Sequence, residues 1–274
     1  MSLEHGHSQH DPTLFQGTAW YYARYRSPYP REFFDHLAKV LQLDGRGRAL
    51  DLGCGTGQLA IPLAPYFERV VAMDPDPEMI AEVSAASNRS GLSNLDFVLG
   101  SSLDLSPAMG EFRLVTMGES FHWMDRDQVL RTLETMIVTG GGLAIGSKKF
   151  DMPAGYQEAV DQLLKDFLGE KRRAGQSYYS HPEKRHETVL ARSSFVLLDA
   201  WKQECMYDWT ISDAIGYLYS TSYANKRLLG DQAERFGQEL RRILVQIAPQ
   251  GVFKISITVS ALLARKESCA PARG

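Results

Sequence analysis

Apolar and polar positions alternate along the first 150 residues in a way that predicts strands and helices in turn. Helical spacing predicts a leading helix over residues 31–43, which the turn "DGRG" ends. Short apolar runs predict five strands, at 48–53, 69–74, 95–100, 112–120 and 141–150. The segments between them have helical patterns, at 56–67, 76–91 and 126–137. Such alternation favours parallel pairing through right-handed crossovers, so we expect a Rossmann-like, doubly wound α/β sheet.

The pattern changes after residue 150. We expect helices at 154–168, 212–224 and 231–247, with Ser212 as a helix N-cap, and a strand near 203–210. The segment 169–187 is polar, basic and aromatic, and is expected to be a loop or lid. Residues 253–266 alternate with the period of a half-buried strand. We therefore expect a mostly parallel sheet of seven strands, with an antiparallel late strand and a helical cap.

These patterns predict a division of the chain into four parts. Residues 1–18 are expected to be a disordered leader, 19–150 the ligand-binding core, 151–265 a substrate-selecting cap with the last strands, and 266–274 a tail. The leader contains His5, His7 and His10 in a polar, non-periodic setting, so we expect no metal site.

Composition and charge narrow the function classes. The balance of 30 Lys and Arg against 33 Asp and Glu leaves no overall basic field, which favours a small-molecule substrate over nucleic acid. No apolar run reaches the roughly 18 to 20 residues that span a bilayer, so we expect no membrane partner. Cys54, Cys205 and Cys269 form no paired pattern, which favours the cytoplasm. The oligomeric state is left open.

A glycine-rich turn follows the first predicted strand. Asp51, Gly53, Gly55 and Gly57 spell D-x-G-x-G-x-G, and glycines at a strand-to-helix junction let a ligand approach the backbone. The dinucleotide fingerprint requires G-x-G-x-x-G, whereas Gln58 stands where its third glycine belongs. An acidic Asp51 before the loop repels phosphates and favours a positive group. The turn therefore predicts a cationic ligand.

The same turn resembles the first motif of the class I S-adenosylmethionine-dependent methyltransferases. The resemblance continues at "VVAMD", where Asp74 ends the second strand 23 residues after Asp51, near the spacing of about 20 for an acidic ribose ligand. It implies S-adenosylmethionine as cofactor, S-adenosylhomocysteine as product, and ribose hydroxyls on Asp74. The cofactor contacts implied in these two motifs are Asp51, Gly53, Cys54, Gly55, Gly57, Gln58, Asp74, Pro75 and Met79.

A third motif follows the third strand. Similar enzymes often carry Gly-Asp-Ala there, with the Asp at the adenine amino group, whereas this chain has Gly100, Ser101 and Ser102. Ser101 can still accept a hydrogen bond, and Leu103 can pack on the adenine ring. Ser101, Ser102 and Leu103 are therefore the expected adenine contacts, with Asp104 a weaker candidate. The loss of the usual carboxylate also leaves room for a non-catalytic cofactor-binding protein.

Two further segments resemble the branch that includes trans-aconitate methyltransferase and the malonyl-carrier-protein methyltransferase. In "MGESFHWMD" that branch places a polar residue before Trp, here His122 and Trp123. "YYARYRSPYP" resembles its Tyr- and Arg-rich segment, which implies cofactor contacts by Tyr22 and by Arg26 or Arg24. Glu119 either binds the cofactor amino group or caps the next helix. The resemblance covers residues 22–150.

The chemistry of methyl transfer needs an aligned nucleophile and, where the nucleophile carries a proton, a base. His122 is the candidate base, and the alternative is a histidine that only fixes the loop. Aromatic and basic residues are candidate substrate contacts, although packing or solvation also accounts for them: Trp20, Tyr25, Trp123, Tyr178, Tyr179 and His181. We expect methyl transfer to a small molecule, first at hydroxyl or carboxylate oxygen and next at an amine. A nucleic-acid methyltransferase and a nicotinamide oxidoreductase are weaker alternatives.

Overall fold

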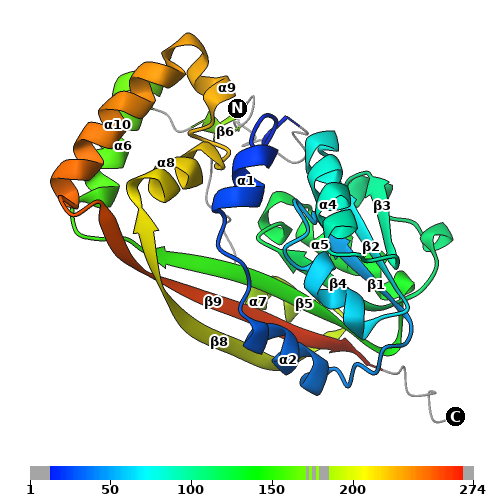
Figure 1. Cartoon of the computed structure of the whole chain (residues 1–274). Coiled ribbons are helices and arrows are strands. Elements are labelled where there is room, and N and C mark those ends of the chain that lie inside the picture. The colour runs from blue at the N-terminus through cyan, green and yellow to red at the C-terminus, as the bar shows by residue number, and fades with distance from the viewer. Residues whose placement is uncertain (1–12, 171–172, 175–176, 179–184, 268–274) are drawn as a thin grey trace, which may run out of the picture. The chain divides into compact units, whose positions relative to one another are not determined.

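The computed structural model describes residues 13–170, 173–174, 177–178 and 185–267 (Figure 1). Its main sheet has seven strands in the order β3-β2-β1-β4-β5-β9-β8. The strands are β1 (Arg48–Leu52), β2 (Arg69–Asp74), β3 (Leu95–Leu99), β4 (Phe112–Gly118), β5 (Ile137–Asp151), β8 (Phe195–Thr210) and β9 (Val252–Lys266). A separate small sheet pairs β6 (Arg173–Ala174) with β7 (Ser177–Tyr178).

Helices connect the strands in the predicted alternation. The α-helices are α1 (Ala19–Tyr25), α2 (Arg31–Val40), α3 (Ala60–Leu63), α4 (Pro77–Arg89), α5 (Arg126–Met136), α6 (Tyr156–Leu168), α7 (His186–Leu190), α8 (Ile211–Tyr219), α9 (Lys226–Leu229) and α10 (Ala233–Ile247). Short 3₁₀ turns are η1 (Ala64–Tyr66), η2 (Ser102–Asp104), η3 (Pro107–Met109), η4 (Phe121–Trp123) and η5 (Gly230–Gln232). No helix among the described residues has the length and apolar content to cross a bilayer.

The first five strands are parallel. Leu50 of β1 aligns with Val71 of β2 on one side and with Val115 of β4 on the other. Parallel registers also join β2 to β3 and β4 to β5. Because these strands all run in the same direction, their carboxyl ends lie at the same edge of the sheet. The loops after β1, β2, β3 and β4 therefore lie at that edge. The predicted fold class, with its antiparallel late strand β9, is confirmed.

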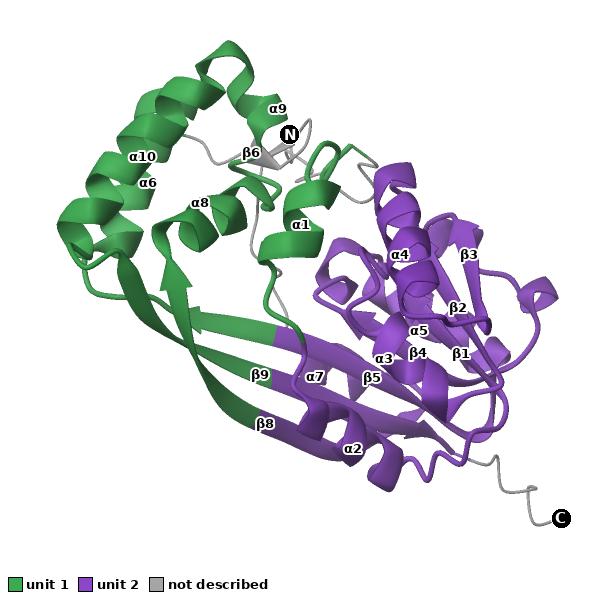
Figure 2. Cartoon of the chain, viewed as in Figure 1, with its two compact units in different colours: residues 1–28, 148–181, 203–259 green, residues 29–147, 182–202, 260–274 purple. Residues whose placement is uncertain are grey.

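The protein is divided into two compact units, which Figure 2 shows in different colours. Unit 1 comprises residues 1–28, 148–181 and 203–259, and unit 2 comprises 29–147, 182–202 and 260–274. Each long strand, β5, β8 and β9, therefore has residues in both units. The units interleave along the chain, whereas the predicted division into 19–150 and 151–265 is sequential.

Unit 2 buries the central strands on both faces. Alternate side chains such as Leu50, Val71 and Val115 join a core cluster with Leu130 and Leu133 of α5. Residues of the opposite parity along β1 and β2 are also fully buried. Strands that are apolar on both sides read as continuous hydrophobic runs, so the sequence pattern is enough to predict them.

Unit 1 contains helices that pack through aromatic rings. In α8, Gly216 lies so close to the ring of Tyr25 in α1 that an added Cβ would come within 2.3 Å of it. Phe167 of α6 meets Phe236 of α10 edge to face, with ring centroids 5.3 Å apart. Such contacts depend on which helices meet in space, so the packing of this unit was harder to predict than that of unit 2.

Three expectations about element ends are corrected. Helix α8 begins at Ile211 with Thr210 as its N-cap, because the Thr210 hydroxyl accepts from Asp213 N (3.1 Å) and the Asp213 carboxylate accepts from Thr210 N (2.8 Å). Ser212 is therefore inside the helix. Strand β8 begins at Phe195, ahead of the predicted 203–210. Strand β5 begins at Ile137, ahead of the predicted 141, and its register with β4 shifts between Phe112 and Leu114 as in a β-bulge.

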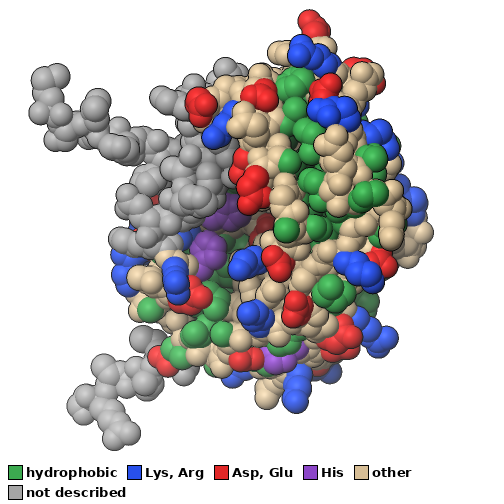
Figure 3. Space-filling model, turned by 90° about the vertical axis from the view of Figure 1, so that its left-hand side faces the viewer, with side chains coloured by type: hydrophobic (Ala, Val, Ile, Leu, Met, Phe, Trp, Pro, Cys, Tyr) green, Lys and Arg blue, Asp and Glu red, His purple; other side chains and the backbone are tan. Residues whose placement is uncertain are grey.

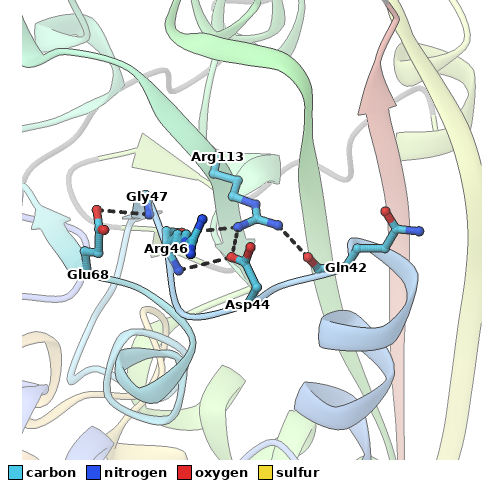
Figure 4. Close-up of polar contacts among 6 residues, drawn as sticks. All are labelled: Gln42, Asp44, Arg46, Gly47, Glu68 and Arg113. Carbon is cyan, nitrogen blue, oxygen red and sulfur yellow. Dashed lines mark hydrogen bonds and ion pairs between the residues drawn. The ribbon is translucent and has the colours of Figure 1, made fainter.

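The loop that leads from α2 to β1 is held by an arginine from β4 (Figure 4). The Arg113 guanidinium donates to the Asp44 carboxylate and to the carbonyl oxygens of Gln42 and Arg46. Gln42 has φ of 53°, a left-handed conformation that non-glycine residues seldom adopt. Nearby, Gly47 N donates to the Glu68 carboxylate at 3.2 Å. This cluster fixes where β1 begins.

Candidate functional site

The glycine turn after β1 adopts a backbone that only glycine tolerates easily. Gly53, Gly55 and Gly57 have φ values of 72°, 52° and 87°. The turn is tied to β2, since Gly53 N and Cys54 N both donate to Met73 O, at 2.8 and 3.0 Å. It is also closely packed, because a Cβ on Gly57 would lie 2.5 Å from a methyl carbon of the α4 side chain Val83. The turn thus presents bare backbone at the carboxyl edge of the sheet.

Asp74 at the end of β2 faces this turn. Its Oδ2 accepts from Gly55 N at 2.8 Å and its Oδ1 accepts from Asp76 N at 3.0 Å. Burial raises the pKa of Asp74 to about 6, although the two backbone donors oppose that shift. Each carboxylate oxygen has a further lone pair, so Asp74 can also accept hydroxyl donors.

Asp51 is enclosed beneath the turn. It is 1% exposed, its Oδ1 accepts from the Thr116 hydroxyl (2.7 Å) and its Oδ2 from Ala60 N (3.0 Å). Burial raises the pKa of Asp51 to about 7, with the Asp74 charge adding to the rise. The side chain therefore joins β1 to β4 and to the start of α3, and it supports the turn from below.

A third acid, Asp76, was not singled out from the sequence. It is the N-cap of α4, where its Oδ1 accepts from Glu78 N at 2.8 Å. The residue is 4% exposed, and its Oδ2 is buried with no hydrogen-bond partner in the described part of the chain. A buried carboxylate oxygen without a donor costs free energy, which a ligand hydroxyl or amine at this position would offset. The sequence "DPD" at residues 74–76 is the signal from which Asp76 could have been identified.

The turn after β3 carries the third predicted group of contacts. Ser101 N and Oγ both donate to Asp104 Oδ2, at 2.8 and 2.9 Å, and Ser101 Oγ accepts from Leu103 N at 3.2 Å. A carboxylate thus stands at this turn after all, supplied from three residues later. Leu99 and Leu103 are each 61% exposed. Exposed leucines beside a carboxylate suit a flat ring that carries an amino group.

The loop after β4 touches the glycine turn directly. Ser120 Oγ donates to Leu52 O at 2.7 Å, and a Cβ on Gly53 would lie 2.5 Å from Ser120 Cβ. Glu119 has φ of 58°, and its backbone N–H donates to Gly146 O at 3.0 Å. Strained non-glycine backbone of this kind concentrates at functional sites. The same loop continues into η4, which carries His122 and Trp123.

His122 lies in an apolar, partly cationic setting. Its ring is 4.8 Å from that of Trp123 and 6.4 Å from that of His186, between centroids. Burial lowers the pKa of His122 to about 4, and His186 and Arg126 contribute to that lowering. The imidazole is therefore neutral near pH 7, able to accept a proton but only as a weak base. Sequence reasoning missed Arg126 and did not link His186 to this loop.

The remaining predicted contacts of unit 2 have varied surroundings. Cys54 is buried, which together with the charges of Asp74 and Asp51 raises the pKa of its thiol. Met79 is 2% exposed, whereas Pro75 is exposed, so of these two predicted contacts only Pro75 is accessible to solvent. Gln58 is half-buried at the end of the turn. In the described residues no group of three His, Cys, Asp or Glu side chains is arranged to hold a metal ion.

The cofactor contacts predicted near α1 belong to unit 1. Arg26 donates from Nε to Ser220 Oγ (2.8 Å) and from Nη2 to Ser220 O (3.2 Å). Its guanidinium lies over the rings of Tyr22 and Tyr217, 4.7 and 4.8 Å from their centroids. This arrangement ties α1 to α8. The cofactor contacts predicted for Tyr22 and Arg26 stay predictions.

Other residues of α1 and the basic loop were predicted to meet the substrate. Trp20 is 48% exposed and stacks against the guanidinium of Arg24 at 4.2 Å, and the ring of Tyr25 lies on Gly216. Tyr178 ends β7. Substrate contacts by these residues stay predictions. The other predicted or considered residues lie outside the described part of the chain: Tyr179, His181, His5, His7 and His10.

Comparison with known proteins agrees with this geometry. Residues 49–141 match the family described as "Methyltransferase domain". That segment contains the glycine turn, the acids Asp51, Asp74 and Asp76, and the loop after β4. Residues 49–141 therefore match a methyltransferase domain, in line with the S-adenosylmethionine-dependent class that the sequence predicts.

Two curated relatives are similar over part of their length. An uncharacterized methyltransferase of Mycobacterium tuberculosis is 28% identical over 158 residues, which is 57% of this chain and 61% of that protein. The trans-aconitate 2-methyltransferase of Deinococcus radiodurans is 32% identical over 120 residues, 43% of this chain and 42% of its own. The match thus spans less than two thirds of either relative. The predicted branch is represented by a distant relative and stays a prediction.

Solved structures share the fold. A protein of Anaeromyxobacter dehalogenans, provisionally classed as a type II methyltransferase, has a TM-score of 0.59 at 24% identity, covering 88% of this chain and 98% of its own. A SAM-dependent methyltransferase from Thiobacillus denitrificans, solved with S-adenosyl-L-homocysteine, has a TM-score of 0.51 at 14% identity, covering 93% and 99%. At these identities the likeness establishes the architecture alone.

Proposed function

We propose that this chain transfers the methyl group of S-adenosylmethionine to a small-molecule acceptor, at a hydroxyl or carboxylate oxygen. The observation that carries the proposal is the pairing of Asp74 with the bare glycine turn, through the 2.8 Å hydrogen bond from Gly55 N. This pairing leaves an acid and an open backbone side by side at the carboxyl edge of a parallel sheet, where ligands of this architecture bind.

The residues present fit the cofactor. Asp74 accepts the ribose hydroxyls, and the orphaned Oδ2 of Asp76 accepts a further donor of the same ligand. The adenine ring packs on the exposed Leu99 and Leu103, with the carboxylate of the turn after β3 at its amino edge. Asp51 acts as a positioning residue, because both its carboxylate oxygens already accept hydrogen bonds from the protein, one from Ala60 N and one from the Thr116 hydroxyl.

The cofactor supplies an activated methyl on a sulfonium sulfur, so the protein's task is mainly alignment. The loop after β4 adjoins the cofactor turn, since Ser120 bonds to Leu52 O beside the glycines. The bound cofactor would supply its methyl carbon to the acceptor oxygen with loss of the sulfur–carbon bond, which would leave S-adenosylhomocysteine as the other product. A hydroxyl acceptor also loses its proton, for which the neutral imidazole of His122 is the base; a carboxylate needs no base.

Calorimetry tests the proposal. The parent protein is expected to bind S-adenosylhomocysteine, and Asp74→Ala to abolish measurable binding. Asp96→Ala is the matched control, because Asp96 is an exposed carboxylate of β3 that pairs with the surface Arg69 at 3.4 Å. Unchanged affinity in Asp74→Ala overturns the ribose assignment. Release of labelled S-adenosylhomocysteine with a pool of small hydroxyl and carboxyl compounds then tests turnover.

A further inference from the structure

Strand β8 forms one edge of the main sheet and is much longer than the strand at the other edge. It spans the 16 residues Phe195–Thr210, whereas β3 spans five. β9 pairs with one side of β8, and no strand in the described part of the chain pairs with its other side (Figure 1). The backbone N–H and C=O groups along that side form a template for a further strand. Natural proteins keep their free edges short or covered, so an open edge of this length favours pairing with another chain.

The same strand carries an exposed row of side chains. Its even-numbered residues from 196 to 210 are all exposed, whereas the odd-numbered ones from 199 to 209 are half-buried or buried. In the described residues nine large hydrophobic side chains are exposed, and four of them belong to β8: Val196, Leu197, Leu198 and Met206. Exposed apolar side chains that gather on one element mark an interaction surface.

Charged residues in the exposed row are available to a partner. The Asp208 carboxylate lies 3.8 Å from the Lys254 ammonium on β9, in a pair whose side chains are 66% and 83% exposed. An ion pair this exposed to water contributes little and leaves the carboxylate able to accept from a second cation. Lys202, earlier in the same row, has no hydrogen-bond or ion-pair partner among the described residues. The row therefore offers a cation and an anion that a partner strand can match.

These two charges match each other when β8 pairs with β8 of a second copy. An antiparallel pair with a two-fold axis perpendicular to the sheet sets even-numbered residues opposite even-numbered residues, on the same face. If the axis passes through Cys205, Lys202 of each copy lies opposite Asp208 of the other, which gives two ion pairs across the strands. The two Met206 side chains then lie diagonally across from each other, within reach of long side chains. Residues 200–210 of each copy pair, and the exposed methionine surface is covered.

Other registers place the charges unfavourably. An axis through Glu204 sets two carboxylates opposite each other, and an axis through Met206 sets Glu204 opposite Asp208. An axis through Gln203 gives the lysine a carboxylate partner. It also sets the Asp208 carboxylate opposite the apolar Leu198, which desolvates a charge without pairing it. The charges of the row thus specify the axis through the cysteine.

We infer that this chain forms a two-fold dimer in which β8 pairs antiparallel with β8 of a second copy about Cys205. The two sheets then continue into each other, and the free edge is removed. Figure 3 shows acidic and basic side chains interspersed on the face that it presents, and the net charge of the chain is -3. No strong field of one sign therefore opposes association. The inference concerns assembly and is independent of the proposed function.

Sedimentation equilibrium of the full chain tests the dimer. Lys202→Glu and Asp208→Lys each set like charges opposite each other, so each is expected to weaken the dimer about tenfold or more. The double variant with both substitutions exchanges the two charges and should restore the affinity of the parent. Lys39→Glu is the matched control, because Lys39 is an exposed lysine of α2 and its replacement changes the net charge by the same amount as Lys202→Glu. A monomeric parent, or equal dimer affinity in all variants, overturns the inference.

Cys205 tests the register. Cα atoms of directly opposite residues in an antiparallel pair lie about 4.5–5.5 Å apart, within the range of about 4.4–6.8 Å that a disulfide spans. In a Cys269→Ser background the other cysteine, Cys54, is buried. Diamide, which takes up the two protons and two electrons, should therefore link the Cys205 thiols of two copies, and Lys202→Glu should suppress the link. A dimer that yields no disulfide overturns the inference, whereas a dimer that fails to bind S-adenosylhomocysteine overturns the proposed function alone.

Discussion

The backbone of Gly53 lies directly against the side chain of Ser120. A Cβ on Gly53 would come within 2.5 Å of Ser120 Cβ and 3.5 Å of Met124 Cε. Strands β1 and β4 thus bring together two loops that are far apart in the chain. Methionine side chains adapt to new neighbours, whereas Ser120 is buried and bonded to Leu52 O, so it has little freedom to move.

Replacing Gly53 by alanine should therefore disturb the site as well as the backbone. The left-handed φ alone costs roughly 1–2 kcal/mol, and the contact with Ser120 adds about 1–3 kcal/mol of overpacking. Urea unfolding measures the total. Gly91→Ala is the control, because Gly91 has φ of 67° with nothing within 4 Å of the added Cβ. Equal losses in the two variants would contradict the packing argument.

The buried carboxyl of Asp51 makes stability depend on pH. Its folded pKa is about 7, whereas the unfolded value is near 3.8, so between these values the folded state binds more protons than the unfolded state. The stability cost of ionising Asp51 thus grows as pH rises through this window and is complete above pH 7. Asp51→Asn removes that cost, and the amide can still accept from Ala60 N and donate to the Thr116 hydroxyl.

Asp51→Asn should therefore raise Tm at pH 8 and have little effect near pH 4.5. We expect the substitution to raise the free energy of unfolding at pH 8 by about 1 kcal/mol or more. For a chain of this size, that corresponds to a rise in Tm of roughly 2–4 °C. Thermal unfolding without cofactor at both pH values measures the difference. The exposed Asp96→Asn should give no pH-dependent change. A Tm increment that is the same at both pH values would refute the assignment.

Sequence patterns predicted the parallel half of the fold well. The strands around Leu50 and Val71 are apolar on both faces, and the glycine turn has a local signature. Asp74 could be proposed for the same reason, because its place at the end of a strand is a local property. Features that depend only on neighbouring residues were therefore predictable.

Features that depend on assembly were not predictable. Arg126 and His186 meet across 60 residues, and neither has a local pattern that distinguishes it from a surface residue. Asp104 was only a weaker candidate from the sequence, because its carboxylate reaches the turn after β3 through a 3₁₀ turn that folds it back onto Ser101. The N-cap of α8 is different, because the capping box of Thr210 with Asp213 is a local signature that the choice of Ser212 overlooked.

His122 should matter for turnover and not for cofactor affinity. With a hydroxyl acceptor, His122→Ala is expected to lower turnover by about 100-fold, the lower end of the range for loss of a general base, with the affinity for S-adenosylhomocysteine unchanged. Because its pKa is held near 4, loss of activity through its protonation is confined to pH values below about 5. His36→Ala is the control, since His36 instead pairs with Asp199 at 2.6 Å. If His122→Ala turned over as fast as the parent protein, His122 would not be the general base.

Arg113 holds the loop between α2 and β1 by its bonds to Asp44, Gln42 and Arg46 (Figure 4). It lowers the pKa of the Asp44 carboxyl through a direct hydrogen bond. A lowered folded pKa contributes stability above the unfolded value of 3.8, and that contribution is lost as pH falls through the folded pKa. The loss of stability on removing Arg113 should therefore be smaller at acidic pH.

Arg113→Ala is expected to lower Tm at pH 7 by roughly 2–4 °C, because two backbone carbonyls lose a charged donor and the left-handed Gln42 loses its support. At pH 3 the decrease should be smaller. Arg69→Ala is the matched control, since its pair with Asp96 is about half-exposed on both sides and such pairs contribute little. Thermal unfolding of both variants at both pH values decides the matter: equal decreases in Arg113→Ala and Arg69→Ala would show that the loop does not depend on this arginine.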